Sequence, residues 1–283
     1  MRWVGRRQSS NVEDRRGVGG GRIAVGGGVG AVIIALIVLF LGGDPGTILN
    51  QGQNSYIPGS PVATTISTQN DEMTQFVRVV LADTEDMWTQ QFQELGRTYR
   101  PPILVLFTGS VQTGSGLATA ATGPFYSPTD QKVYIDVSFY QELQDRFQAP
   151  GDFAQAYVIA HEVGHHVQNL LGILDRVSAQ ERQVSEEAAN ELSVRVELQA
   201  DFFAGMWAHY DQTILGVLEP GDIDEALNAA SAIGDDRIQM QTRGYVAPDT
   251  FTHGTSEQRS RWFKLGYDTG DISRGIRSSA KPL

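Results

Sequence analysis

Apolar side chains recur at steps of three and four residues along much of the chain that follows residue 70. This is the spacing of one buried helix face, and it is clearest over Glu72–Gln93. The same pattern, interrupted by Gly and Pro, predicts four more helices over about residues 152–171, 179–210, 222–240 and 256–267. Helices are therefore expected to form most of the fold.

Two short segments show a strand pattern instead. Ile103–Phe107 is a continuous apolar run, and Lys132–Val137 alternates between polar and apolar residues. Together they predict one small sheet, so the expected fold class is α+β and predominantly helical. Lys132–Val137 is also a candidate edge to which an extended peptide could add as a further strand.

A run of nineteen residues without a charged side chain, Ile23–Leu41, predicts a single transmembrane helix. The basic residues before it indicate a cytoplasmic N-terminus and an extracytoplasmic C-terminal part. A cleaved signal peptide is the alternative, but the run is longer than is usual for one and no Ala-x-Ala site follows it. The predicted organisation is a basic cytoplasmic tail, a membrane anchor, a flexible linker and a folded domain, over residues 1–22, 23–43, 44–70 and 71–283.

Composition narrows the chemistry that the folded domain can perform. The 283 residues include no Cys, which excludes disulfides, thiolate metal sites and a cysteine nucleophile. His, Asp and Glu remain as metal ligands. The formal net charge of -11 argues against a nucleic-acid partner. The oligomeric state stays open.

The sequence His161-Glu162-Val163-Gly164-His165 lies within the predicted helix that begins near residue 152. Residues four apart lie one above the other on a helix, so the His161 and His165 imidazoles converge on one point and Glu162 projects beside it. This H-E-x-x-H pattern is typical of a zinc site that still needs a third ligand. The alternative is two structural histidines on a buried helix face.

Glu197 and Asp201 lie one turn apart on the long helix that follows, where the sequence becomes apolar. Buried carboxylates are costly unless they are paired or bind a metal ion. Glu197 is therefore the candidate third ligand. Asp201 is the candidate partner for the second ring nitrogen of a ligating histidine. A solvated helix face with two carboxylates is the alternative.

His253 precedes the last predicted helix, and Arg259 and Arg261 lie in the first turns of that helix. Cations are disfavoured at a helix N-terminus, so one arginine is expected to pair with a carboxylate. His253 is a candidate donor to the oxyanion of a tetrahedral intermediate. The alternatives are a structural loop histidine and solvated arginines. We expect His166 to be structural and His209 to be a partly buried or surface histidine.

Three segments resemble the motifs of the neutral zinc metallopeptidase family of bacterial membrane-anchored proteins. They are His161–Gln168, Glu197–Gly205 and Thr252–Arg259. The resemblance implies a zincin-like domain of the gluzincin kind, with one Zn²⁺ per chain. His161, His165 and Glu197 would bind the metal, and Glu162 would be the general base.

The spacing of His253 and Arg259 is also similar to the C-terminal motif of CAAX-type membrane peptidases, which implies a role in the site for both. Members of the neutral zinc metallopeptidase family often carry a cysteine pair where this chain has Thr122 and Ser127.

The resulting hypothesis is a membrane-anchored, zinc-dependent endopeptidase that acts on protein or peptide substrates. Asp201 and Arg259 would support its ligands, and His253 would assist catalysis. One alternative is a non-catalytic extracytoplasmic peptide-binding or scaffold protein with a zinc site. A metallohydrolase of small molecules is another.

Overall fold

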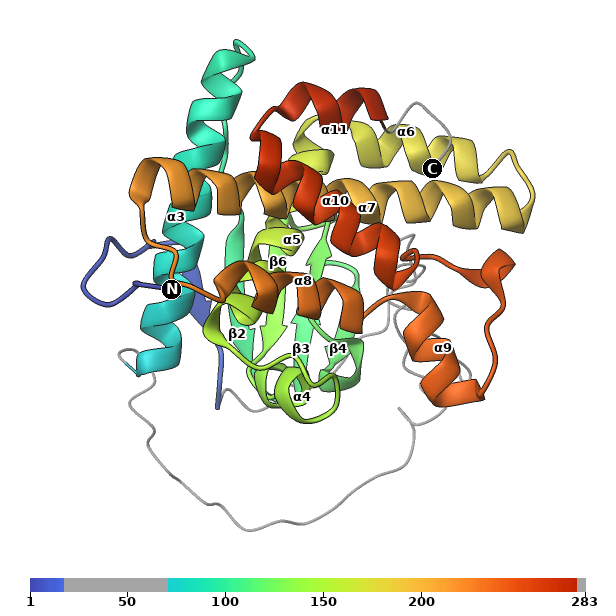
Figure 1. Ribbon diagram of the computed structural model, residues 1–283, viewed down its shortest axis with the longest axis horizontal. Coiled ribbons are helices and arrows are strands. Elements are labelled where there is room, and N and C mark those ends of the chain that lie inside the picture. Colours follow the sequence, from blue (N-terminus) through green and yellow to red (C-terminus); the bar gives the residue numbers. More distant parts are fainter. Residues whose placement is uncertain (18–70, 279–283) are drawn as a thin grey trace.

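Helices pack against a four-stranded sheet in the computed structural model, which describes residues 1–17 and 71–278 (Figure 1). Helix α5 (Asp152–Leu170) packs against the sheet as well as against α3 (Glu72–Glu94), α7 (Glu186–Tyr210) and α8 (Asp222–Ala232). Helix α10 (Ser256–Thr269) crosses α7. The shorter helices are α4 (Phe139–Asp145), α6 (Ile173–Glu181), α9 (Asp235–Arg243) and α11 (Ile272–Ser278). The prediction of a mostly helical α+β fold is confirmed.

The sheet has the strand order β1-β2-β6-β5. Strands β1 (Val12–Asp14), β2 (Ile103–Phe107) and β6 (Lys132–Asp136) are parallel, and β5 (Phe125–Ser127) is antiparallel to β6. Strand β6 pairs with β2 along its whole length and with β5 over Lys132–Tyr134. The prediction that a peptide strand adds along the whole of Lys132–Val137 is therefore wrong. A separate hairpin, β3 (Ser110–Thr113) with β4 (Gly116–Thr119), has no counterpart in the sequence prediction.

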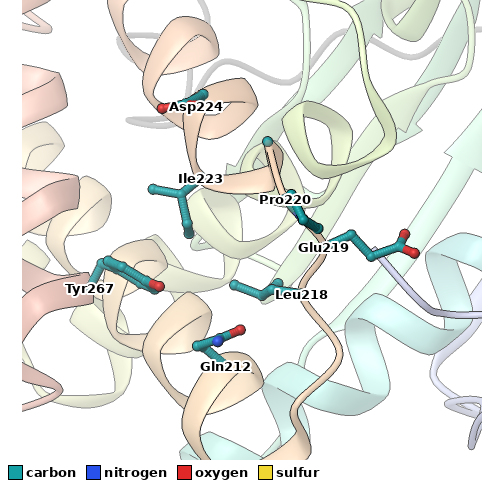
Figure 2. Close-up of a pocket in the computed structure, with 8 residues that line it drawn as sticks. Gln212, Leu218, Glu219, Pro220, Ile223, Asp224 and Tyr267 are labelled. Carbon is teal, nitrogen blue, oxygen red and sulfur yellow. The ribbon is translucent and has the colours of Figure 1, made fainter.

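A cavity of about 370 Å³ lies where α8 and α10 meet the segment that follows α7 (Figure 2). Its lining consists of Gln212, Leu218, Glu219, Pro220, Gly221, Ile223, Asp224 and Tyr267. None of the residues predicted for the metal site lies among them.

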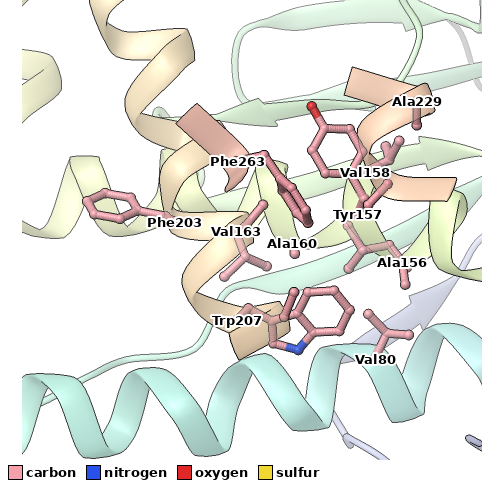
Figure 3. Close-up of a cluster of buried hydrophobic side chains, with 14 of the residues drawn as sticks. Val80, Ala156, Tyr157, Val158, Ala160, Val163, Phe203, Trp207, Ala229 and Phe263 are labelled. Carbon is pink, nitrogen blue, oxygen red and sulfur yellow. The ribbon is translucent and has the colours of Figure 1, made fainter. Parts of the chain in front are cut away.

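The core surrounds α5, whose apolar residues are buried on every side of the helix (Figure 3). Phe153 stacks on Trp207 of α7 with 5.3 Å between ring centroids, and Tyr157 meets Phe263 of α10 edge to face at 5.5 Å. A helix that is apolar all round belongs in the interior of a fold, which explains its central position.

Two of the predicted helices are divided in the structure. The expected helix over 179–210 consists of α6 and α7, because Ser185 caps a new helix by accepting a hydrogen bond from the Ala188 N–H. The expected helix over 222–240 is interrupted at Gly234. A Cβ at Gly234 would lie 2.3 Å from the backbone nitrogen of Ser256, so the close approach there requires glycine.

Residues 1–17 pack on the folded domain, and this differs from the predicted separate tail. They supply β1, and Arg6 pairs with both carboxylate oxygens of Asp83 at 2.7 and 2.8 Å. Arg16 pairs with Asp71, which caps α3, at 2.7 Å. The predicted anchor and linker over 23–43 and 44–70 lie outside the described residues. Within the described ranges, no helix is long and apolar enough to cross a membrane.

Candidate metal centre

Helices α5 and α7 bring three candidate ligands together. The Nε2 atoms of His161 and His165 are 3.2 Å apart. Glu197 Oε2 lies 3.2 Å from His161 Nε2, and its Oε1 lies 3.4 Å from His165 Nε2. The histidines converge because they are one turn apart on α5, and the packing of α7 against α5 adds the carboxylate.

These separations fit a zinc ion. Zinc binds imidazole nitrogen and carboxylate oxygen at about 2.0–2.1 Å in a tetrahedron, whose ligand atoms are then about 3.3 Å apart. The three donors are His, His and Glu, which are common zinc ligands. They are also the donors that the H-E-x-x-H pattern and Glu197 predicted.

The spacing of the two ligand-bearing helices depends on Gly164, the fourth residue of the H-E-x-x-H pattern. A Cβ at Gly164 would lie 3.1 Å from the Cα and the carbonyl oxygen of Ala200 on α7. Glycine therefore lets the two helices approach closely beside the ligands.

Asp201 orients His161 through the Nδ1 atom of its ring. Its Oδ1 accepts a hydrogen bond from His161 Nδ1 at 2.8 Å and another from the Tyr157 hydroxyl at 2.5 Å. Burial alone would raise the pKa of Asp201, but Arg259 and His161 hold it below its ordinary value. The carboxylate is thus ionised and fixes the proton on Nδ1, which leaves the Nε2 lone pair for a metal.

Arg259 is the buried arginine and Arg261 is exposed, which resolves the choice that the sequence left open. The Nε and Nη2 atoms of Arg259 donate to the two oxygens of Asp201 at 2.8 and 3.0 Å. This bidentate pair neutralises the carboxylate inside the protein.

Glu162 is 8% exposed and lies next to the ligands in the sequence of α5. Burial raises its pKa above the ordinary glutamate value, although the two neighbouring histidines act in the opposite direction. A carboxylate with a raised pKa accepts a proton more readily near neutral pH. For Glu197, burial is outweighed by His165 and His253, which hold its pKa well below the ordinary value.

His253 lies in the loop before α10 and faces the charge of Glu197, which with Asp235 raises its pKa against the effect of burial. Asp235, which the sequence analysis did not identify, shapes this loop. Its Oδ2 accepts the backbone N–H groups of Thr252, His253 and Gly254 at 2.9, 2.6 and 2.9 Å. Its Oδ1 lies 3.4 Å from His253 Nδ1.

His166 and His209 lie apart from the ligands. His166 is buried between the Tyr126 hydroxyl and the Arg100 carbonyl oxygen, at 3.1 and 2.7 Å, and burial lowers its pKa to about 4. His209 Nδ1 contacts the Tyr267 carbonyl oxygen at 2.6 Å. Tyr157 contacts Asp201 through its hydroxyl group, and Gln168 contacts His165 through its amide. The sequence analysis gave neither residue a role, because a tyrosine or an amide that supports a ligand belongs to no ligand pattern.

Two histidines and one carboxylate on packed helices, with a glutamate beside them, form the arrangement that is typical of zinc metallopeptidases. The family described as "Putative neutral zinc metallopeptidase" matches residues 1–275, and the chain belongs to this family. The resemblance stated from the three motifs is thereby confirmed.

The similar proteins have names that state no function. The chain is 52% identical to "Uncharacterized protein YpfJ" of Escherichia coli K12 over 282 residues, which is 96% of each chain. It is 42% identical to "Uncharacterized protein Rv2575" of Mycobacterium tuberculosis H37Rv over 247 residues, which is 82% of each chain. No solved structure matches it significantly.

Proposed function

We propose that the protein is a zinc-dependent endopeptidase of the zincin-like, gluzincin kind. The convergence of His161 Nε2, His165 Nε2 and Glu197 within 3.2–3.4 Å carries this proposal. The family match supports both the metal and the protein or peptide substrate. One Zn²⁺ per chain is expected.

The residues around the centre have distinct roles in hydrolysis. When bound, zinc supplies Lewis acidity toward the scissile carbonyl and lowers the pKa of a water molecule. Glu162 takes a proton from the attacking water and passes it to the leaving amine. His253 donates a hydrogen bond to the oxyanion.

Asp201 and Arg259 act through His161. The ionised carboxylate holds the imidazole by its Nδ1–H, and the guanidinium holds the carboxylate. Neither group needs to move a proton during the reaction. Their contribution is to keep the His161 ring oriented.

Metal content tests the site directly. We expect about one zinc per chain in the purified protein by elemental analysis, because the three donors match its coordination. His161→Ala and Glu197→Ala should each lose the metal. His166→Gln is the matched control, since this neighbouring histidine points away from the ligands, and it should keep the metal. Absence of zinc uptake by the wild type would contradict the proposal.

Glu162→Gln tests catalysis separately from binding. We expect this variant to retain zinc and to lose peptide hydrolysis by about 10²–10⁴-fold, because the amide cannot take the proton. A peptide-library cleavage assay with and without a chelator measures the loss. If the wild type binds zinc but cleaves nothing, and Glu162→Gln leaves its cellular role unchanged, the protein is a scaffold with a zinc site.

A further inference from the structure

Gln168 joins the two helices that carry the ligands. It lies on α5 three residues after His165, and it is completely buried. Its Oε1 is 2.9 Å from His165 Nδ1. Its Nε2 donates to the backbone carbonyl of Val196, the residue before Glu197, at 2.6 Å. One amide thus contacts a ligand on α5 and the backbone beside a ligand on α7.

The Val196 carbonyl determines the orientation of this amide. A carbonyl oxygen only accepts hydrogen bonds, so the NH₂ group of Gln168 must face it and Oε1 must face His165. The imidazole then carries its proton on Nδ1, and the lone pair on Nε2 points to the other ligands. The tautomer of His165 follows from a backbone contact on the other helix.

A second amide extends the same chain of contacts to the C-terminal helix. Gln168 Nε2 also donates to Gln199 Oε1 at 3.1 Å, and Gln199 Nε2 donates to the Gly275 carbonyl on α11 at 3.1 Å. This second carbonyl fixes the orientation of Gln199 in the same way. Backbone carbonyl groups therefore determine the orientation of both amides, Gln168 and Gln199.

We propose that Gln168 is the positioning residue for His165, as Asp201 is for His161, and that it also holds Glu197 at the correct distance. This inference rests on the zinc centre of the proposed function. Partners of this kind fix the ring orientation of a ligating histidine, and their loss typically weakens metal affinity by about 10–100-fold.

Two substitutions separate positioning from packing. Gln168→Met preserves the length of the side chain and removes both hydrogen bonds. Gln168→Glu keeps an acceptor for His165 Nδ1 and removes the donor to Val196. Gln239→Met is the matched control, because Gln239 is a buried amide that contacts Thr250 and Ala247 and no candidate ligand.

The first measurement is the zinc dissociation constant of the full chain by chelator competition. We expect Gln168→Met to weaken it by about 10–100-fold and Gln239→Met to leave it unchanged. The second is the hydrogen bond from the His165 Nδ1–H to Gln168, followed in the metal-free protein by ¹⁵N-edited NMR as the protection of this proton from exchange with water. Wild type and Gln168→Glu should show a protected Nδ1–H, and Gln168→Met should lose it.

A wild-type zinc affinity and a protected His165 Nδ1–H in Gln168→Met would overturn the proposal, even if the variant were less stable. The NMR measurement needs no metal. If the wild type bound no zinc, the proposed function would fail, and the protection of the Nδ1–H would still show whether Gln168 positions His165.

Discussion

At the scale of single residues, Asp201 is the most constrained group of the centre. Its two oxygens accept hydrogen bonds from Tyr157 and His161 of α5 and from Arg259 of α10. The side chain is 0% exposed, so water cannot replace a lost partner. Removal of one partner therefore leaves a buried charge or an unsatisfied acceptor.

Arg259→Met should destabilise the metal-free protein by about 3–5 kcal/mol, because it leaves the Asp201 charge unpaired in the interior. Urea unfolding followed by circular dichroism measures this loss. Arg261→Met is the control, and it should change stability by less than about 0.5 kcal/mol because that arginine is exposed. Equal effects of the two substitutions would show that the buried ion pair contributes little.

At the scale of elements, the crossing of α7 and α10 brings Asp201 to Arg259. Two glycines permit this crossing. A Cβ at Gly205 would lie 2.0 Å from the Phe263 carbonyl oxygen, and a Cβ at Gly266 would lie 2.0 Å from that of Phe202. The obstructing atoms belong to the backbone, so a rotamer change cannot relieve the clash.

Gly205→Ala should therefore destabilise the protein by about 1–3 kcal/mol or more, although alanine favours an isolated helix. The clash pushes α10 away from α7 and weakens the contact between Arg259 and Asp201. Thermal unfolding measures the effect. Gly164→Ala should cost less, because its nearest atoms are 3.1 Å away. A stabilised Gly205→Ala variant would show that the helices can separate without penalty.

At the scale of the whole molecule, residues 1–17 and the domain form one body, and this bears on the predicted membrane anchor. Arg16 and Asp71 stand on either side of the apolar run 23–41 in the sequence and form a 2.7 Å ion pair. A single crossing of a bilayer would separate the two flanks by about 30 Å. A single-pass anchor and the docked N-terminal segment therefore exclude each other.

Because the sequence contains no cysteine, single introduced cysteines can test whether the N-terminal segment is docked or separated from the domain by a membrane. Val4 and Tyr245 are 80% and 59% exposed, one in the N-terminal segment and one in the domain. Val4→Cys and Tyr245→Cys should react alike with a membrane-impermeant maleimide in spheroplasts, both labelled or both protected, because the docked segment shares a compartment with the domain. Labelling of one position only would support the single-pass arrangement predicted from the sequence, with the segment undocked.

The local pattern of the sequence was sufficient for much of the fold and for the three candidate ligands that the structure brings together. The strand Ile103–Phe107 and the helices from Glu72, Asp152 and Ser256 agree closely with prediction, because their hydrophobic period extends over whole elements. The helix breaks at Ser185 and Gly234 were missed, since a cap and a close contact interrupt the period only briefly.

By itself, the sequence determined which side chains share a helix face, because a spacing of four residues places them there in any α-helix. His161 with His165, and Glu197 with Asp201, are of this kind. Only the tertiary structure decided which arginine meets Asp201, which carbonyl orients the Gln168 amide toward His165, and that residues 1–17 join the sheet. These contacts join residues far apart in the sequence, so the packing of the elements decides which of them meet.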